Sequence, residues 1–285
     1  MNQLQESRTA IRVAVLRAAH QVLDAEPKIL VDPISIRLVP EACEGALRAD
    51  VQRLQQAPAR SLRANFVLRS RFAEDRLEEA VRRGVTQYVV LGAGLDTLAY
   101  RQPNWAHRLT IVEIDHPASQ QFKIARLQSA GINVPPNVRF FSLDFGRDDV
   151  EESLADAPLD RAKPIFVSWL GVTQYLTCHA IRATLRSVAS WVAGSEIALT
   201  YVVDDWSSLD ADERAAMEGA ETRAAASGEP WLSKFSVLAI VDLLSASGFT
   251  RIEPFTIEEA KKRYFRNRVD KLQPSAGTGL VSART

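Results

Sequence analysis

The sequence is poor in the residue types that build disulfide frameworks and metal centres. Among 285 residues it has two cysteines, Cys43 and Cys178, and four histidines, and these do not cluster. Two cysteines far apart supply neither a disulfide framework nor a metal site, and tetrahedral zinc needs four grouped ligands. We therefore expect a reduced protein that holds no metal.

The chain also lacks an excess of either charge and any long hydrophobic run. Lysine plus arginine number 35, and aspartate plus glutamate also number 35, so nothing favours nucleic acid or a membrane surface as a partner. No stretch approaches the roughly 18 apolar residues of a transmembrane helix, and residues 1–9 have no apolar signal region. With 46% hydrophobic residues, the composition predicts a globular, soluble, cytoplasmic protein with a real core.

Residues 87–101 carry the most informative pattern. Residues 88–91 (Tyr-Val-Val-Leu) form a short apolar run of the length and composition of a buried strand. Gly92 and Gly94 then allow a tight turn and a close approach of a ligand to the backbone. Because residues 95–100 are expected to restart as a helix, the layout is that of a nucleotide-type pocket.

Acidic residues follow the second predicted strand. The apolar run 109–112 leads to Glu113 and Asp115, about 20 residues beyond the glycine turn, where a carboxylate is placed to hold a ribose diol. The spacing alone leaves open which of the two acids does so.

The charges at the turn distinguish between two classes of ligand. A pyrophosphate-binding turn would have a third glycine where this chain has Thr97, and Asp96 would repel phosphates at a helix N-terminus. A carboxylate there suits a positively charged ligand, such as the amino group and sulfonium of S-adenosylmethionine. We favour that ligand. The alternatives are a dinucleotide, as in a nicotinamide-dependent oxidoreductase, and a purely structural turn.

Strand-like and helix-like segments alternate five times along the chain, which predicts a parallel sheet with right-handed crossovers and ligands beyond the carboxyl ends of its strands. A helix, a strand and a loop then precede the last strand, so we expect that strand to be antiparallel. The predicted strands are 88–91, 109–112, 137–143, 164–170, 196–203, 251–255 and 279–285. The predicted helices between them are 117–130, 147–160, 180–193, 210–226 and 237–245, whereas the basic stretch 261–271 is interpreted as a solvated face.

The chain is expected to form a single domain, 1–285, in four parts. Residues 1–84 contain predicted helices at 9–23, 45–54 and 59–83 and would form a helical cap over the active-site edge. Residues 85–206 would be the cofactor-binding core, residues 207–234 a lid inserted after the fifth strand, and residues 235–285 the rest of the sheet.

Four groups of residues together resemble a known family. They are Leu91 to Thr97 with Tyr100-Arg101, Glu113 to Pro117, Trp169 to Val172 with Tyr175-Leu176, and Gly228 to Trp231. This combination resembles the S-adenosylmethionine-dependent methyltransferases related to leucine carboxyl methyltransferase, especially their bacterial and actinobacterial branch, over nearly the whole chain. The resemblance implies an α/β fold with a Rossmann-like, mostly parallel seven-stranded sheet, an antiparallel last strand and a helical cap.

The resemblance also implies roles in cofactor binding. An arginine in the helix before the first strand would bind the methionine carboxylate; Arg71 is the match, with Arg69 as a nearby candidate. Asp115 is favoured over Glu113 for the ribose, and Asp144 would accept the adenine amino hydrogens beside Phe145. The complete predicted set is Arg71, Gly92, Ala93, Gly94, Asp115, Asp144, Phe145 and Trp169.

The acceptor side is less well defined. Many relatives have Glu-Gly-Leu where this chain has residues 170–172 (Leu-Gly-Val), so the acceptor surroundings are expected to differ. Tyr175, Tyr201 and Trp231 are candidates to line an acceptor pocket, with a role as core aromatics as the alternative for each. No catalytic residue is identified.

The lack of an obvious base favours certain acceptors. A carboxylate is ionised at neutral pH and needs no base, whereas a hydroxyl would need one, and the four histidines are interpreted as surface or capping residues. We therefore expect methyl transfer to a carboxylate or acidic hydroxyl of a small molecule, with secondary metabolism as one possible setting. A non-catalytic cofactor-binding relative is a further alternative.

Overall fold

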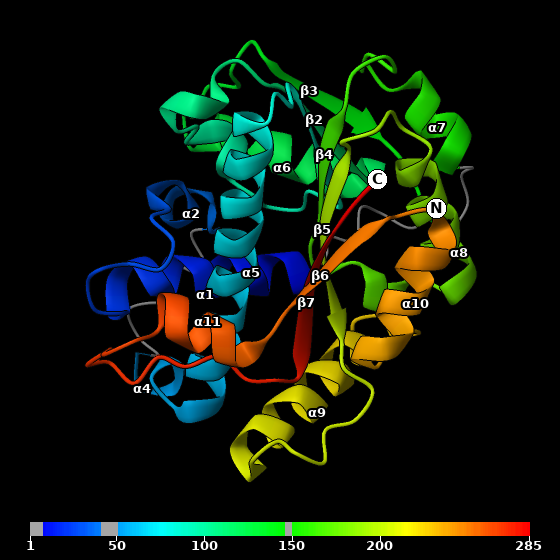
Figure 1. The fold of residues 1–285 in the computed structure, drawn as a ribbon. Helices are drawn as coiled ribbons and strands as arrows, with labels where there is room; N and C mark the ends of the chain where they lie inside the picture. Colours follow the sequence, from blue (N-terminus) through cyan, green and yellow to red (C-terminus); the bar gives the residue numbers. More distant parts are fainter. Residues whose placement is uncertain (1–7, 41–50, 146–149) are drawn as a thin grey trace.

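The centre of the fold is one seven-stranded sheet in the order β3-β2-β1-β4-β5-β7-β6 (Figure 1). The computed structural model describes residues 8–40, 51–145 and 150–285. β7 pairs antiparallel with both β5 and β6, and the other paired strands are parallel, which confirms the predicted topology. The strands are β1 Gln87–Leu91, β2 Thr110–Asp115, β3 Val138–Ser142, β4 Ile165–Trp169, β5 Glu196–Val202, β6 Arg251–Phe255 and β7 Thr278–Arg284.

Helices cover both faces of the sheet (Figure 1). α5 Ala57–Arg82, α6 Pro117–Ser129 and α11 Ile257–Tyr264 lie on one face, and α7 Val150–Asp156, α8 Cys178–Ala189 and α10 Val237–Ser247 lie on the other. Alternate side chains of β1 enter the two cores: Tyr88 and Val90 pack on the α5 side, and Val89 and Leu91 on the α8 side. Burial of β1 on both faces explains its uninterrupted apolar sequence.

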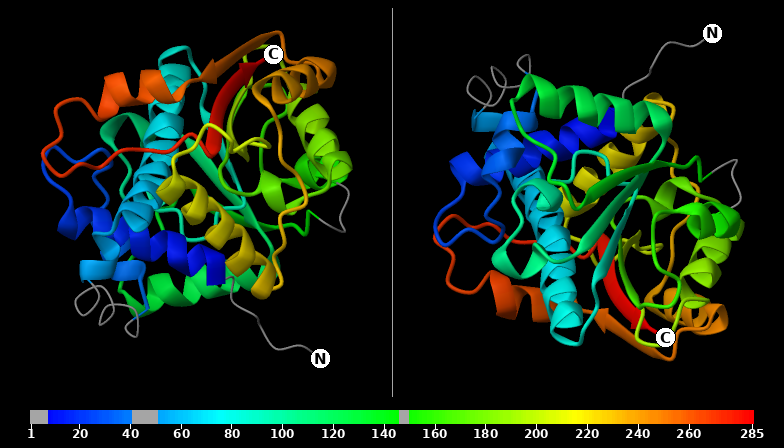
Figure 2. Two further views of the ribbon diagram at one scale, coloured as in Figure 1. Left: turned by 90° about the horizontal axis from the view of Figure 1, so that it is seen from below. Right: turned by 90° about the horizontal axis from the view of Figure 1, so that it is seen from above.

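The N-terminal helices and the predicted lid meet at one end of the sheet. α1 Arg8–Leu23 packs on α2 Pro33–Leu38 and α5, and α4 Val51–Leu54 packs on α5. α9 Ala211–Ala226, within the predicted lid, packs on α5 as α1 does, and both helices are seen from below in Figure 2. A hydrogen bond joins the two segments, since the Thr9 hydroxyl donates to the Glu229 carboxylate at 2.6 Å.

Two local predictions were wrong. The expected helix at 95–100 is only a single 3-10 turn, η1 Leu98–Tyr100, because the Asp96 carboxylate accepts from the Leu98 N–H (2.9 Å) and closes a local turn. The histidines were expected at the surface or as caps, but His20 is fully buried and lies against Asp24. The basic stretch 261–271 is largely exposed, as expected of a solvated face, and begins inside α11, whose start is a capping box of Thr256 and Glu259. Residues 45–50 and 147–149 of two predicted helices lie outside the described residues. The remaining short turns are η2 Asn104–Ala106 and η3 Thr173–Tyr175.

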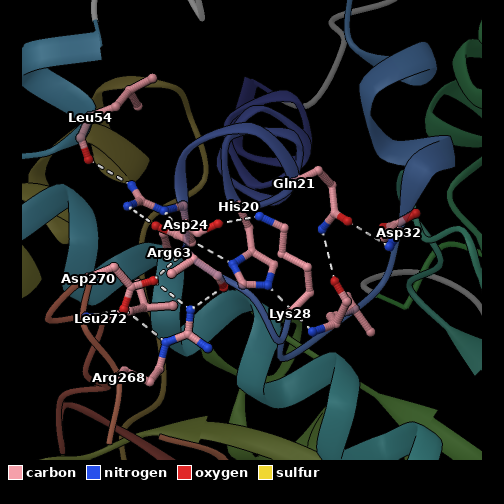
Figure 3. A network of polar contacts seen from close by, with 12 residues as sticks. His20, Gln21, Asp24, Lys28, Asp32, Leu54, Arg63, Arg268, Asp270 and Leu272 are labelled. Atoms are coloured by element: carbon pink, nitrogen blue, oxygen red, sulfur yellow. Dashed lines mark hydrogen bonds and ion pairs between the residues drawn. The ribbon is translucent and has the colours of Figure 1, made fainter.

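A buried polar network anchors the segment after α1 to α5 (Figure 3). Asp24 accepts two hydrogen bonds from the Arg63 guanidinium, at 2.8 and 2.7 Å, and lies 2.7 Å from His20 Nδ1. Arg63 also donates to the Leu54 carbonyl at 2.7 Å. Burial opposes ionisation of Asp24, but the hydrogen bonds from His20 and Arg63 hold its pKa below the usual value. Arg268 extends the network by donating to the Ala25 carbonyl at 2.7 Å.

Replacing Asp24 should therefore destabilise the fold strongly. Asp24→Asn leaves the Arg63 guanidinium, 1% exposed, without its counter-ion, and we expect the free energy of unfolding in urea to fall by about 3–5 kcal/mol. The matched control is Glu78→Gln, which removes a surface pair with Arg82 and should cost roughly 0.5 kcal/mol or less.

The same prediction has a pH dependence. Because the folded-state pKa of Asp24 is lowered, its contribution is complete above the unfolded value of about 3.9 and is lost as the pH falls through the folded value. The stability difference between the wild type and Asp24→Asn should shrink in that acidic range. A difference below about 1 kcal/mol at pH 7 would contradict the role given to this ion pair.

Candidate functional site

A cavity of about 690 Å³ opens at the carboxyl ends of β1, β2, β3 and β4, within the size range of small-molecule sites. The ends of these strands, α1, α5, the loop after β4 and residues 228–232 after α9 surround it. The sequence-predicted residues that line it are Gly92, Ala93, Gly94, Asp115, Asp144, Phe145 and Tyr175. The edge predicted from strand order is therefore where these side chains meet.

The glycine turn after β1 is required by the packing around it. Gly92 and Gly94 have φ values of +69° and +44°, in the left-handed region that favours glycine. A Cβ on Gly92 would overlap the Val172 side chain, whereas one on Gly94 would lie 3.7 Å from the Ala10 methyl group. The first glycine thus admits the loop after β4, and the second lies under α1.

Asp115 faces the cavity, and Glu113 does not. The Asp115 carboxylate accepts from the backbone N–H groups of Gly94 (2.5 Å) and His116 (2.7 Å), while burial raises its pKa. A carboxylate offers about four acceptor positions, so Asp115 can accept further hydrogen bonds. Glu113 is buried against Lys123 (2.7 Å) and the Tyr100 hydroxyl (2.8 Å).

Arg71 lies outside the cavity, so its predicted contact with a cavity ligand is not supported. Its guanidinium pairs with Asp75 at 2.8 Å, is 44% exposed and lies near the Tyr264 ring. Arg69, the second candidate, lines the cavity instead. Residues two positions apart on an α-helix point about 200° apart, which separates the two guanidinium groups.

Arg69 is a cation that lacks an anionic partner within the part of the chain that the structure describes. Its guanidinium packs beside Gly171 and 4.8 Å from the Phe66 ring centroid. Burial, with a smaller effect of Arg17, lowers the pKa of Arg69 to about 10, so the group stays charged at neutral pH. An anion bound in the cavity would stabilise that charge.

The second cavity arginine, Arg17, is already engaged and was missed by the sequence reasoning. It pairs with Asp32, donates to the Thr97 hydroxyl (2.6 Å) and lies 3.8 Å from Asp96. Arg101 also donates to the Thr97 hydroxyl, at 3.0 Å. Thr97 therefore occupies the third-glycine position of a phosphate-binding turn and joins two arginines.

Three predicted aromatic residues do not line the cavity. Trp169 and Tyr201 are buried in the core on the α8 side. Trp231 packs edge-on against Trp206, with ring centroids 6.3 Å apart, and Lys234 lies near both rings. Of the acceptor-pocket candidates, only Tyr175 faces the cavity. Tyr201 is thus a core aromatic, the alternative considered for it, whereas Trp231 is only partly buried.

Two findings place the chain in a family. Residues 10–189 match the family model described as leucine carboxyl methyltransferase. YktD of Bacillus subtilis, provisionally named an S-adenosyl-L-methionine-dependent methyltransferase, is 33% identical over 223 residues, which are 78% of this chain and 71% of YktD. The chain belongs to the leucine carboxyl methyltransferase family. It is an S-adenosylmethionine-dependent methyltransferase, and an oxidoreductase is not favoured.

Other relatives match less of the chain or only its fold. Rv3399 of Mycobacterium tuberculosis, with the same provisional name, is 35% identical over 153 residues, 53% of this chain and 42% of that protein. A provisionally named methyltransferase from Thermobifida fusca superposes with a TM-score of 0.58 at 15% identity, covering 96% of this chain and 94% of that one. A DUF574 protein from Streptomyces avermitilis gives 0.54 at 15% identity, over 95% and 96%. Both structures support the Rossmann-like fold.

Within 8–40, 51–145 and 150–285, no helix has both the length and the apolar character to cross a membrane. In the same ranges, no three His, Cys, Asp or Glu side chains are grouped as a metal site would require.

The packing at Gly92 predicts a stability difference between two glycines. Gly131 has a φ of +60°, and a Cβ there would have no neighbour within 4 Å. Gly131→Ala should therefore cost only backbone strain, about 1–2 kcal/mol. Gly92→Ala adds the overlap with Val172 and should cost about 1–3 kcal/mol more. Urea denaturation of both variants measures the difference, and equal costs would mean that Val172 does not require glycine there.

Proposed function

We propose that this methyltransferase transfers the methyl group of S-adenosylmethionine to an oxygen atom of a small molecule, a carboxylate or an acidic hydroxyl, in secondary metabolism. The observation that carries the proposal is the order of charges along one sheet edge. Asp144 follows β3 and Asp115 ends β2. The Arg69 guanidinium, which has no anionic partner among the described residues, lies near the loop after β4. In that order, these groups match the adenine amino group, the ribose diol and the amino-acid carboxylate of the cofactor.

Each group suits one part of the cofactor. The Arg69 guanidinium can hold the methionine carboxylate with two parallel hydrogen bonds, and the Asp96 carboxylate, 19% exposed, suits the positively charged amino group. Asp115 has acceptor positions left for the ribose hydroxyls. Asp144 can accept from the adenine amino group. Gly92, Ala93 and Gly94 supply the floor between them.

This arrangement leaves the β4 side of the cavity for the acceptor. When bound, the cofactor supplies a methyl group that is already activated for transfer. The residues of the chain then have to align the acceptor with that methyl group and exclude water. The segment after α9, which the Thr9–Glu229 hydrogen bond joins to α1, would exclude water by covering the cavity.

Binding of S-adenosylhomocysteine, measured by isothermal titration, tests the cofactor site. Arg69→Met removes the guanidinium, and we expect the dissociation constant to rise by roughly 10–150-fold, equivalent to about 1.5–3 kcal/mol for a lost hydrogen bond to a charged group. Arg71→Met is the matched control from the same helix and should stay within about twofold, because Arg71 pairs with Asp75 outside the cavity.

Two results would contradict this assignment. A larger loss in Arg71→Met than in Arg69→Met would return the carboxylate to Arg71. No measurable binding of S-adenosylmethionine or S-adenosylhomocysteine to the wild type would remove the proposed site altogether.

A further inference from the structure

Glu229 is an acidic side chain of the cavity whose role the cofactor does not explain. It follows Gly228, whose φ of +79° ends α9 with a tight turn, and its N–H donates to the Ala224 carbonyl at 3.0 Å. Its half-buried carboxylate lines the cavity and accepts from Thr9 at 2.6 Å. It pairs with no Lys, Arg or His within the described ranges, so most of its acceptor positions are open.

The surroundings of Glu229 differ from those of the other cavity acids. Asp96, Asp115 and Asp144 follow the ends of β1, β2 and β3, where the nucleoside and the amino acid of the cofactor would lie. The walls on the β4 and lid side are mainly apolar. They comprise Val172, Tyr175, Leu176, Pro230 and Leu232.

Neither of the two arginines that line the cavity in the described part of the chain is available to an acceptor. Arg17 is held by Asp32, Thr97 and the Leu95 carbonyl, and the proposed function gives Arg69 the methionine carboxylate. An acceptor carboxylate on the lid side would therefore meet the Glu229 carboxylate, and the described cavity lining has no lysine or further arginine to offset the repulsion. A neutral hydroxyl would instead find an acceptor for its proton.

We propose that Glu229 binds the methyl acceptor and selects a neutral compound with an apolar body and a hydroxyl group over a carboxylate. This inference rests on the proposed O-methyl transfer and narrows its acceptor. The acceptor hydroxyl donates to Glu229. Its oxygen forms the new bond to the methyl carbon as the methyl–sulfur bond breaks and leaves its electron pair on sulfur. The hydroxyl proton passes to the Glu229 carboxylate, so charge and atoms balance.

A panel of matched acceptors tests the selectivity. Pairs such as 1-naphthol with 1-naphthoate, and 4-methylphenol with 4-methylbenzoate, are incubated with the wild type and radiolabelled S-adenosylmethionine, and methyl ethers are separated from methyl esters. We expect ethers of the hydroxyl members, with at least tenfold less ester from their carboxylate partners. Preferred ester formation, or no ether from any hydroxyl member, overturns the proposal.

The same samples separate this inference from the proposed function. If S-adenosylhomocysteine binds in titration and esters form, the methyltransferase stands and only the role of Glu229 fails. If no cofactor binds, the proposed site fails and this inference fails with it.

Variants test the proton transfer itself. Glu229→Gln keeps a hydrogen-bond acceptor but cannot take up the proton, so the rate with the best hydroxyl acceptor should fall by roughly 10²–10⁴-fold at neutral pH. The rate should then recover as the pH rises towards the pKa of the acceptor, which ionises by itself. The dissociation constant for S-adenosylhomocysteine should stay within about twofold.

Two further variants exclude a merely structural role for Glu229. Glu221→Gln changes another lid acid, which pairs with Lys234 at 2.8 Å outside the cavity lining, and its pH–rate profile should follow that of the wild type. Thr9→Val removes the contact between α1 and the lid but leaves the carboxylate. If Glu229→Gln and Thr9→Val lower the rate equally at every pH, Glu229 acts only as a lid contact and the proposal is overturned.

Discussion

The site depends on a buried ion-pair network around the turn after β1. Arg17 and Arg101 share the Asp32 carboxylate and the Thr97 hydroxyl, and Arg101 also pairs with Glu74 on α5. Asp32 is fully buried, and Arg101 holds a pKa above the ordinary arginine value because these carboxylates outweigh its burial. Removing one member would leave another charge unpaired, which is costly in a protein interior. The network therefore fixes α1, the turn and α5 in one arrangement.

That arrangement determines which charges remain available to ligands. Since Asp32 and Glu74 satisfy Arg17 and Arg101, the guanidinium left without an anion among the described cavity residues is that of Arg69. Asp32 also caps α2 by accepting from the Ser35 N–H at 3.1 Å. The same contacts bring Ala10 over Gly94 and place Thr9 within reach of Glu229. The proposed cofactor and acceptor sides of the cavity are thus positioned by one set of buried pairs.

The sequence allowed the sheet, its ligand-binding edge and the position of Asp115 to be predicted, because strand periodicity and parallel order determine them. Strand periodicity could not decide whether Arg69 or Arg71 faces the ligand-binding edge. Which side of α5 faces the cavity depends on the elements that cover each side. The partner of Arg71 is Asp75, which also accepts from Arg263 and Tyr264 of α11, a helix that was not predicted. The burial of Trp169 could have been expected from its place in a nearly continuous apolar strand, because such strands are covered on both faces, and all five residues of β4 are buried.

The two halves of the cavity have different origins in the fold. The residues proposed to bind the cofactor lie within residues 10–189, the range that the family model matches. Apart from Arg69 on α5 they follow strand ends, where backbone N–H groups such as that of Gly94 hold the Asp115 carboxylate. Thr9 directly precedes that range, at the start of a helix, whereas Glu229 lies well beyond its end, in the loop after α9. Loop side chains can change without disturbing the sheet, and function depends on the site more than on the fold. A shared cofactor site is therefore compatible with acceptors that differ between members of the family, and the acceptor of this chain is best inferred from its own lid.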